Sequence, residues 1–177
     1  MAKRKEFEEL LSPLTDSLYR TALRMTGQDA TAQDLVQETA LRAYRGFGQY
    51  AQGSNFRAWI FRIMTNTLIN DYRRRARGPQ TADVAEIDPS DPSDVEYART
   101  GDVEALTETL GDDARRAIER LPEDFRLVFL LSTFEGFTYR EISEIAGIPI
   151  GTVMSRLFRA RALVRAELLS RVRGKTG

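Results

Sequence analysis

Hydrophobic side chains recur at three- and four-residue spacing through the first half of the chain. One series is Leu11, Leu14, Leu18, Ala22 and Met25, a second is Val36, Ala40 and Tyr44, and a third is Trp59, Ile60, Ile63, Met64 and Leu68. This spacing places each series on one face of an α-helix. The pattern predicts an all-α N-terminal domain, which we bound at residues 1–80.

This helical pattern is interrupted between Gly46 and Ser54. Three glycines within this short stretch favour a loop over a helix. Ser54 or Asn55 is well placed to cap the helix that follows, because short polar side chains accept hydrogen bonds from the first helical amides.

The sequence changes character after residue 80. Residues 81–113 carry eleven carboxylates and one arginine, together with the helix-breaking Pro89 and Pro92. Few large apolar side chains are present to form a core, so residues 81–112 are predicted to be a flexible acidic linker. A second helical domain is expected over residues 113–177, in which Pro122 ends one helical stretch and opens the next.

A helix-turn-helix is predicted in this second domain, from about Thr138 to Arg165. Thr138 and Glu141 have the spacing of a capping box, in which each side chain bonds the backbone amide of the other residue. Gly147 suits the left-handed conformation that ends a helix, and Pro149 suits the start of the next. These residues predict a short helix, a tight turn and a second helix.

The second helix of this motif has two chemically different faces. One is a stripe that should be buried: Val153, Leu157, Ala160 and Val164. The other carries hydroxyl and guanidinium groups: Thr152, Ser155, Arg156 and Arg159. Such groups near the start of a helix suit DNA bases and phosphates, although most charged helical faces are simply solvated.

Zero net charge, from 26 basic and 26 acidic residues, argues by itself against a nucleic-acid binder, but the charges are segregated. Residues 1–80 hold 13 basic and 8 acidic side chains, residues 81–113 hold 1 and 11, and residues 114–177 hold 12 and 7. Two basic blocks therefore flank an acidic strip. Nearly all the basic residues are arginine, which suits guanine and phosphate, but a GC-rich genome produces the same bias.

The chain has no cysteine and no histidine, which removes disulfides, the usual soft metal ligands and the commonest catalytic groups. No phosphate-binding loop and no nucleophile elbow is present, so no metal, cofactor or catalytic residue is expected, and an enzyme that uses carboxylates is the weakest alternative. No apolar run approaches the roughly 20 residues that span a bilayer. The chain is expected in the cytoplasm without membrane insertion.

Two parts of the sequence resemble extracytoplasmic-function (ECF) sigma factors. Residues 136–161 are similar to region 4 of that family, and Leu121-Pro-Glu-Asp-Phe-Arg126 is similar to the helix that precedes it. Asp29-Ala-Thr-Ala-Gln-Asp-Leu-Val-Gln-Glu-Thr39 resembles the polymerase-binding helix of region 2, and residues 56–66 resemble its promoter-melting helix. Within this family, residues 65–70 and Pro149–Ser155 look most like the branch that responds to thiol-oxidative stress.

The resemblance implies a transcription initiator that binds the β′ and β subunits of core RNA polymerase and promoter DNA, both duplex and single-stranded. The residues implied in binding the polymerase are Asp34, Gln37, Glu38 and Arg42. Those implied in recognising and melting the minus-10 element are Tyr50, Phe56, Trp59, Arg62, Asn66, Arg73 and Arg74. Those implied in binding the minus-35 element are Thr152, Ser155, Arg156, Phe158 and Arg159.

The resemblance also implies an anti-sigma factor that covers both domains, and without cysteine or histidine any thiol or zinc sensing would reside in that partner. The linker would thread the polymerase cleft, although a solubilising tether explains its acidity equally well. Met154 stands where many members have arginine, so no base preference transfers.

Two alternatives stay open. Trp59 is equally well explained as a core residue. A stand-alone helix-turn-helix regulator that binds duplex DNA as a dimer is the second hypothesis for the whole chain, and the resemblance of the N-terminal domain argues against it.

Overall fold

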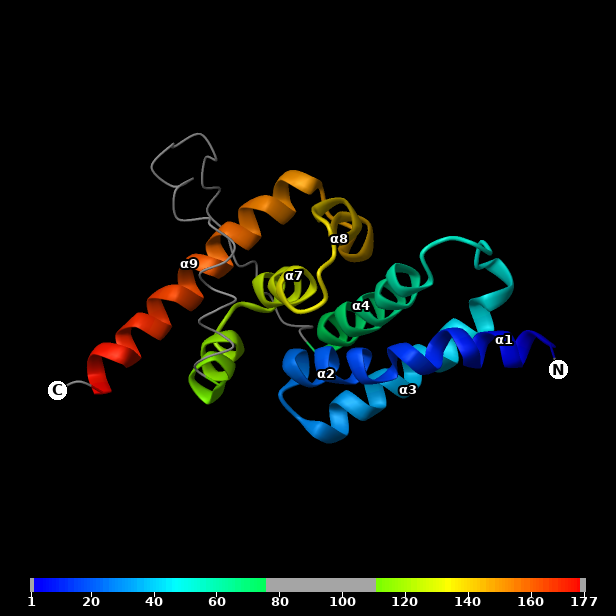
Figure 1. The fold of residues 1–177 in the computed structure, drawn as a ribbon, viewed down its shortest axis with the longest axis horizontal. Coiled ribbons are helices and arrows are strands. Elements are labelled where there is room, and N and C mark those ends of the chain that lie inside the picture. The colour runs from blue at the N-terminus through cyan, green and yellow to red at the C-terminus, as the bar shows by residue number, and fades with distance from the viewer. Residues whose placement is uncertain (1, 76–110, 176–177) are drawn as a thin grey trace. The chain divides into compact units, whose positions relative to one another are not determined.

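The computed structural model describes residues 2–75 and 111–175, and these residues are helical apart from short turns, as the hydrophobic spacing predicts. The chain divides into two compact units, an N-terminal one that contains the helices at residues 2–75 and a C-terminal one that contains most of residues 111–175 (Figure 1). Most of the predicted linker lies outside the described residues. Its last residue, Asp112, belongs to a helical stretch at residues 111–119.

The N-terminal unit is a bundle in which α3 packs against its neighbours on both sides. Its elements are α1 (Ala2–Leu11), a 3-10 helix (Ser12–Leu14), α2 (Thr15–Thr26), α3 (Asp29–Gly46), a second 3-10 helix (Phe47–Gln49) and α4 (Phe56–Arg75). Helix α3 contacts α1, α2 and α4. The largest side chains at its centre, Leu18, Ile60 and Phe61, are almost completely buried.

The buried face of α3 differs from the predicted one by one residue. The stripe expected at Val36, Ala40 and Tyr44 is half-buried or exposed, whereas the buried residues are Ala32, Leu35, Thr39 and Ala43. Thr39 occupies a core position because its hydroxyl donates to the Leu35 carbonyl at 2.7 Å, so no polar atom is left unpaired. The shift leaves Leu41 and Tyr44 exposed on α3.

The segment between Gly46 and Ser54 is also partly helical, contrary to the predicted loop. Gly46 ends α3, and Phe47–Gln49 form a 3-10 turn because the Phe47 side chain is buried, with 6% of its surface exposed. Irregular chain begins at Tyr50. The predicted cap is confirmed at Asn55, whose Oδ1 accepts the Ala58 amide at 3.0 Å.

Two tyrosine hydroxyls connect helices of this bundle. Tyr72 on α4 donates to the Met25 carbonyl at the end of α2, at 3.3 Å. Tyr19 on α2 donates to Asp29 at the start of α3, and this hydrogen bond raises the pKa of Tyr19. Both contacts hold α2 against the helices that follow it in the chain.

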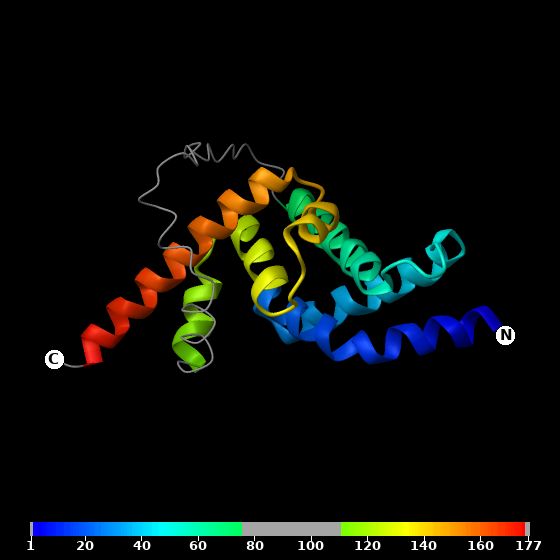
Figure 2. The same ribbon diagram turned by 45° about the horizontal axis from the view of Figure 1, so that its top comes forward.

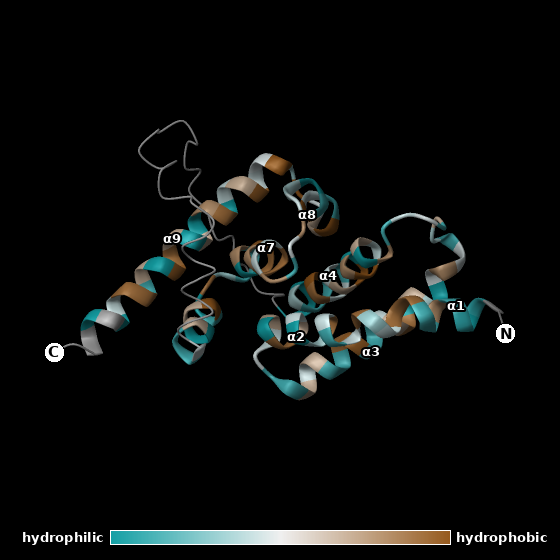
Figure 3. Ribbon diagram, viewed as in Figure 1, coloured by the Kyte–Doolittle hydropathy of each residue, from teal (hydrophilic) through white to brown (hydrophobic). Residues whose placement is uncertain are grey.

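The C-terminal unit consists of the helical stretch at residues 111–119 followed by α7 (Glu123–Thr133), α8 (Tyr139–Ala146) and α9 (Ile150–Lys175). A tight turn joins α8 to α9, which continues as one long helix to the end of the described chain (Figure 2). Helix α7 packs on α9, and its residues from Leu127 to Leu131 are all buried. Hydrophobic and hydrophilic residues alternate along α9, as expected for a helix with one buried face (Figure 3).

Arg126 on α7 holds the end of the preceding helix. Its guanidinium donates to the carbonyls of Ile118 at 3.1 Å, Leu121 at 3.0 Å and Glu119. The last carbonyls of a helix lack partners within it, so a cation that donates to several of them at once stabilises that end. The turn at Pro122 is therefore fixed by a side chain from the helix that follows it.

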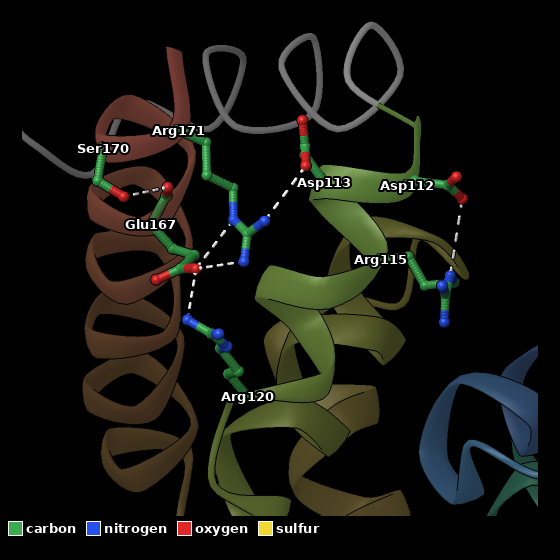
Figure 4. Close-up of polar contacts among 7 residues, drawn as sticks. All are labelled: Asp112, Asp113, Arg115, Arg120, Glu167, Ser170 and Arg171. Carbon is green, nitrogen blue, oxygen red and sulfur yellow. Dashed lines mark hydrogen bonds and ion pairs between the residues drawn. The ribbon is translucent and has the colours of Figure 1, made fainter. Parts of the chain in front are cut away.

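The far end of α9 is tied to the stretch at residues 111–119 by an ion-pair cluster (Figure 4). Arg171 lies between Glu167 at 2.8 Å and Asp113 at 3.3 Å, and Arg120 pairs with the same Glu167 carboxylate at 2.7 Å. Two of these pairs, Arg120 with Glu167 and Arg171 with Asp113, cross between the two segments, and the shared Glu167 carboxylate connects them into one cluster. None of the helices at residues 2–75 and 111–175 is long and apolar enough to cross a membrane.

Candidate nucleic-acid interfaces

The predicted capping box of the helix-turn-helix is confirmed in both directions. The Glu141 amide donates to Thr138 Oγ1 at 3.2 Å, and the Thr138 amide donates to Glu141 Oε2 at 2.8 Å. Gly147 ends α8 with φ of 67°, in the left-handed region, and its amide donates to Ser143 O at 2.9 Å. Pro149 precedes α9 and accepts the Val153 amide at 3.1 Å. Local chemistry therefore sets the turn between the two helices.

The apolar stripe of α9 is buried as predicted. Val153, Leu157, Ala160 and Val164 are each exposed by 1% or less. The residues proposed to contact DNA all lie outside this stripe and are half-buried: Thr152, Ser155, Arg156, Phe158 and Arg159. Their partial burial has a visible cause at Arg156, whose guanidinium extends to Asp124 of α7 at 3.5 Å. On the first turns of α9, Ile150 and Met154 are more exposed than these polar residues.

A buried arginine on α9 went unnoticed in the sequence. Arg161 is 3% exposed, and its guanidinium donates to Tyr139 Oη at 3.4 Å and to Ser132 Oγ at 3.3 Å. It thereby joins α9 to α7 and to the first residue of α8. Arginine is normally assigned to the solvent, but Arg161 lies four residues after Leu157 and three before Val164, so helical spacing alone places it next to the buried stripe, unlike Arg159.

The second candidate interface is an aromatic cluster in the N-terminal unit. Tyr50 stacks on Phe47 with ring centroids 5.7 Å apart and planes inclined by 8°, and its ring lies 5.2 Å from that of Trp59. The Tyr50 hydroxyl donates to the Ser54 carbonyl at 2.6 Å, which closes the loop over the cluster. Tyr50 and Trp59 are half-buried, so part of each ring remains available to another flat group.

Phe56, which was expected to contact DNA, lies inside this cluster. It is 6% exposed, and its ring lies 5.3 to 6.2 Å from those of four neighbours: Phe7, Phe47, Tyr50 and Trp59. A ring enclosed in this way supports the outer rings and offers little surface for a base. The burial of Trp59 is intermediate, because its ring packs on Phe56 while part of the side chain remains exposed.

Polar groups extend from the cluster along α4. Arg62 and Asn66 are exposed and follow Trp59 at helical spacing. Arg73 and Arg74 are exposed at the end of the helix, where Arg74 also contacts Asp71. This face combines aromatic, amide and cationic groups, the types that hold single-stranded nucleic acid by stacking, hydrogen bonding and phosphate attraction.

A third surface lies on α3. Asp34, Gln37 and Arg42 are exposed and Glu38 is half-exposed, so the predicted polar face is present. Arg42 Nε donates to Glu38 Oε1 at 2.6 Å, and this hydrogen bond lowers the pKa of the Glu38 carboxyl. Glu38 is therefore a carboxylate at neutral pH. In the described parts of the chain, no three acidic, histidine or cysteine side chains are grouped as a metal site would require.

Comparison with known proteins gives the family. A model of sigma-70 region 2 matches residues 10–78, and a model of sigma-70 region 4 matches residues 112–164. The ECF RNA polymerase sigma factor EcfG of Rhodopseudomonas palustris is 35% identical over 169 residues, covering 88% of this chain and 87% of that protein. The chain belongs to the ECF sigma factors.

One further ECF sigma factor and one solved sigma factor structure extend the comparison. SigE of Mycolicibacterium smegmatis is 34% identical over 165 residues, covering 92% of this chain, which spans 61% of the length of that relative. The solved structure of RpoE from Bartonella quintana, in complex with the anti-sigma factor NepR, superposes with a TM-score of 0.70 at 30% identity. It covers 94% of this chain and 98% of that chain. Sigma factors are non-catalytic subunits of RNA polymerase.

Proposed function

We propose that this chain binds core RNA polymerase, directs it to promoters with separate minus-35 and minus-10 elements, and helps open the DNA near the start site. The observation that carries the proposal is the presence, in one chain, of two different nucleic-acid surfaces. The capped helix-turn-helix suits duplex DNA, whereas the half-exposed aromatic cluster with Asn66 suits single-stranded bases. A stand-alone duplex-binding regulator has no use for the second surface.

The region from 1 to 80 is assigned to polymerase binding and to the minus-10 element. A base turned out of the stack would lie against the exposed parts of Tyr50 and Trp59, with the Asn66 amide available for its hydrogen-bonding edge. Arg62, Arg73 and Arg74 would attract the phosphates of the separated strand, which makes binding dependent on salt. Phe56 would act from beneath, by holding the outer rings.

The region from 113 to 177 is assigned to the minus-35 element. The start of α9 enters the major groove in this arrangement, so the side chains in reach of base edges or phosphates are Thr152, Ser155, Arg156, Phe158 and Arg159. Arg156 would exchange its contact with Asp124 for a contact with DNA. The exposed Met154 adds an apolar side chain, which can contact a thymine methyl group but cannot pair with guanine.

The polar face of α3 is assigned to the β′ subunit of the polymerase. Asp34, Gln37, Glu38 and Arg42 offer both charges and an amide, and the exposed apolar Leu41, four residues after Gln37 and three after Glu38, lies among them. Interfaces with this mixture bury an apolar centre within a polar rim. The acidic linker, most of which lies outside the described residues, would pass through the polymerase cleft between the two domains.

An anti-sigma factor is proposed as the regulator. RpoE of Bartonella quintana binds NepR, and the similarity of this chain to RpoE supports a partner of the same kind. Any thiol or zinc sensing would reside in that partner, since this chain has neither cysteine nor histidine. The thiol-oxidative-stress branch stays a prediction that the relatives' names do not support, and the cytoplasm is the proposed location because the polymerase is there.

The proposal is tested by transcription in vitro with purified core RNA polymerase and a library of randomised promoters. Selective initiation from templates sharing two spaced elements is the expected result, and core polymerase without the chain is the control. Duplex binding by the isolated chain, with no co-purification of core polymerase and no selective initiation, would instead establish a stand-alone regulator.

A further inference from the structure

We infer that α1 is a positioning element of the single-strand site, which holds the loop at residues 47–55 in the conformation that receives a base. The inference rests on the proposed function, because it concerns how the minus-10 surface is built. It adds residues that precede the matched region 2 segment almost entirely. Three side chains of α1 carry it: Lys3, Glu6 and Phe7.

These three residues share one face of α1, at spacings of three and one, and each contacts a different part of the loop region. Phe7 is 5% exposed, and its ring lies 5.2 Å from Phe47 and 6.1 Å from Phe56. Glu6 Oε1 accepts a hydrogen bond from Gln52 Nε2 at 3.0 Å, across 46 positions of sequence. A Cβ built on Gly48 would lie 3.5 Å from Lys3 Nζ, so the Lys3 side chain lies against the backbone there.

The opposite face of α1 carries ion pairs within the helix. Arg4 pairs with Glu8 at 2.7 Å and Lys5 pairs with Glu9 at 3.9 Å, both within the helix. Exposed pairs of this kind contribute little to stability. The contacts with the loop therefore come from the face of α1 that carries Lys3, Glu6 and Phe7.

The outer part of the loop is where a contact with α1 can fix its conformation. Residues 51–55 are exposed, and Gly53 has φ of 82°, a conformation that favours glycine. Two hydrogen bonds within the loop, from the Tyr50 hydroxyl to the Ser54 carbonyl and from the Ser54 amide to the Ala51 carbonyl, close it on itself. The packing of Tyr50 on Trp59 joins the loop to α4, and the bond from Gln52 to Glu6 joins its outer part to α1. A recognition loop fixed in advance binds more tightly, since less conformational freedom is lost on binding.

Glu6→Ala, Gln52→Ala and the double variant test the inference in the assembled holoenzyme. The probe is a fluorescein-labelled single-stranded oligonucleotide carrying the minus-10 sequence selected by the parent protein, alongside copies with each other base at the discriminating position. Each single variant should bind the selected sequence about threefold more weakly, as expected for the loss of one hydrogen bond, and should discriminate less between bases. The double variant should be no weaker than either single variant, because all three lack the same contact.

Glu9→Ala is the matched control, since it removes the same charge from the other face of the same helix. It should bind and discriminate as the parent does. The inference is overturned if Glu9→Ala loses as much as Glu6→Ala, if both loop variants match the parent, or if the losses in the double variant multiply. A parent holoenzyme that selects no promoter would defeat the proposed function itself, whereas a selective parent with unaffected variants would defeat the role of α1 alone.

Discussion

The two candidate nucleic-acid surfaces are built by different means. In the helix-turn-helix, the groups that set the turn are close in sequence: Thr138 bonds Glu141 three residues away, and Gly147 bonds Ser143 four residues away. In the N-terminal unit, Phe7 and Glu6 hold the loop beside Trp59 through contacts with Phe47 and Gln52, which lie forty or more residues later in the chain. The first surface is fixed by local chemistry and the second by tertiary packing.

Because of this difference, substitutions should affect the two surfaces differently. A local cap contributes about 1 kcal/mol and can be lost without unfolding the unit around it. A shared aromatic core contributes to folding and to the shape of the site together, so damage to it affects both. Substitutions in the aromatic cluster should therefore have larger and less separable effects than substitutions in the capping box.

Phe7→Ala is expected to have the largest effect. It removes a ring that is 5% exposed and contacts three others, so it should lower the free energy of unfolding of the N-terminal unit by about 3–5 kcal/mol. Trp59 is the only tryptophan of the chain, so its fluorescence during denaturation measures this unit specifically. Phe134→Ala, at a ring 37% exposed in the other unit, is the control and should leave the Trp59 transition unchanged. A Phe7→Ala transition equal to that of the parent would show that the cluster does not depend on α1.

The same difference between local and tertiary contacts explains why the sequence predicts the helix-turn-helix better than it predicts the N-terminal loop. Thr138, Glu141, Gly147 and Pro149 act within a few residues, so their spacing alone predicted the helix-turn-helix and its buried stripe. The contacts that Phe7 and Gln52 make between α1 and the loop depend on which helices pack together. The spacing of residues within one helix does not predict that packing. The α3 stripe was misplaced by one residue because Thr39 satisfies its own hydroxyl within the helix and can be buried, which a rule based on polarity excludes.

The assigned division of labour between the surfaces predicts two separable defects. Arg159→Ala should weaken discrimination at the minus-35 element by about tenfold, the effect of losing one good arginine contact with a base. Asn66→Ala should leave that discrimination intact and impair opening. Promoter competition measures the first defect, and permanganate reactivity of unpaired thymines near the start site measures the second.

A template with a bubble already formed over the minus-10 element sharpens this test. It should raise initiation by Asn66→Ala toward the parent level, because the cost of opening is removed although the contact with the base is still missing, but it should not restore minus-35 discrimination by Arg159→Ala. Arg115→Ala is the control for lost positive charge, since Arg115 lies outside both surfaces and pairs with Asp112 and Glu119. Identical behaviour of Asn66→Ala and Arg159→Ala on both templates would refute the separate assignments.

The smallest effect is expected at the capping box itself. Thr138→Ala removes the oxygen that accepts the Glu141 amide, so it should lower the free energy of unfolding of the C-terminal unit by about 1 kcal/mol. Helical circular dichroism during thermal unfolding measures the loss, while the Trp59 signal should not change. Thr138→Ser keeps the hydroxyl and should retain most of the stability. If Thr138→Ser were as destabilised as Thr138→Ala, packing of the threonine methyl group, and not capping, would hold the start of α8. Thr138 would then act through tertiary packing, and the helix-turn-helix would not be fixed by local chemistry at this residue.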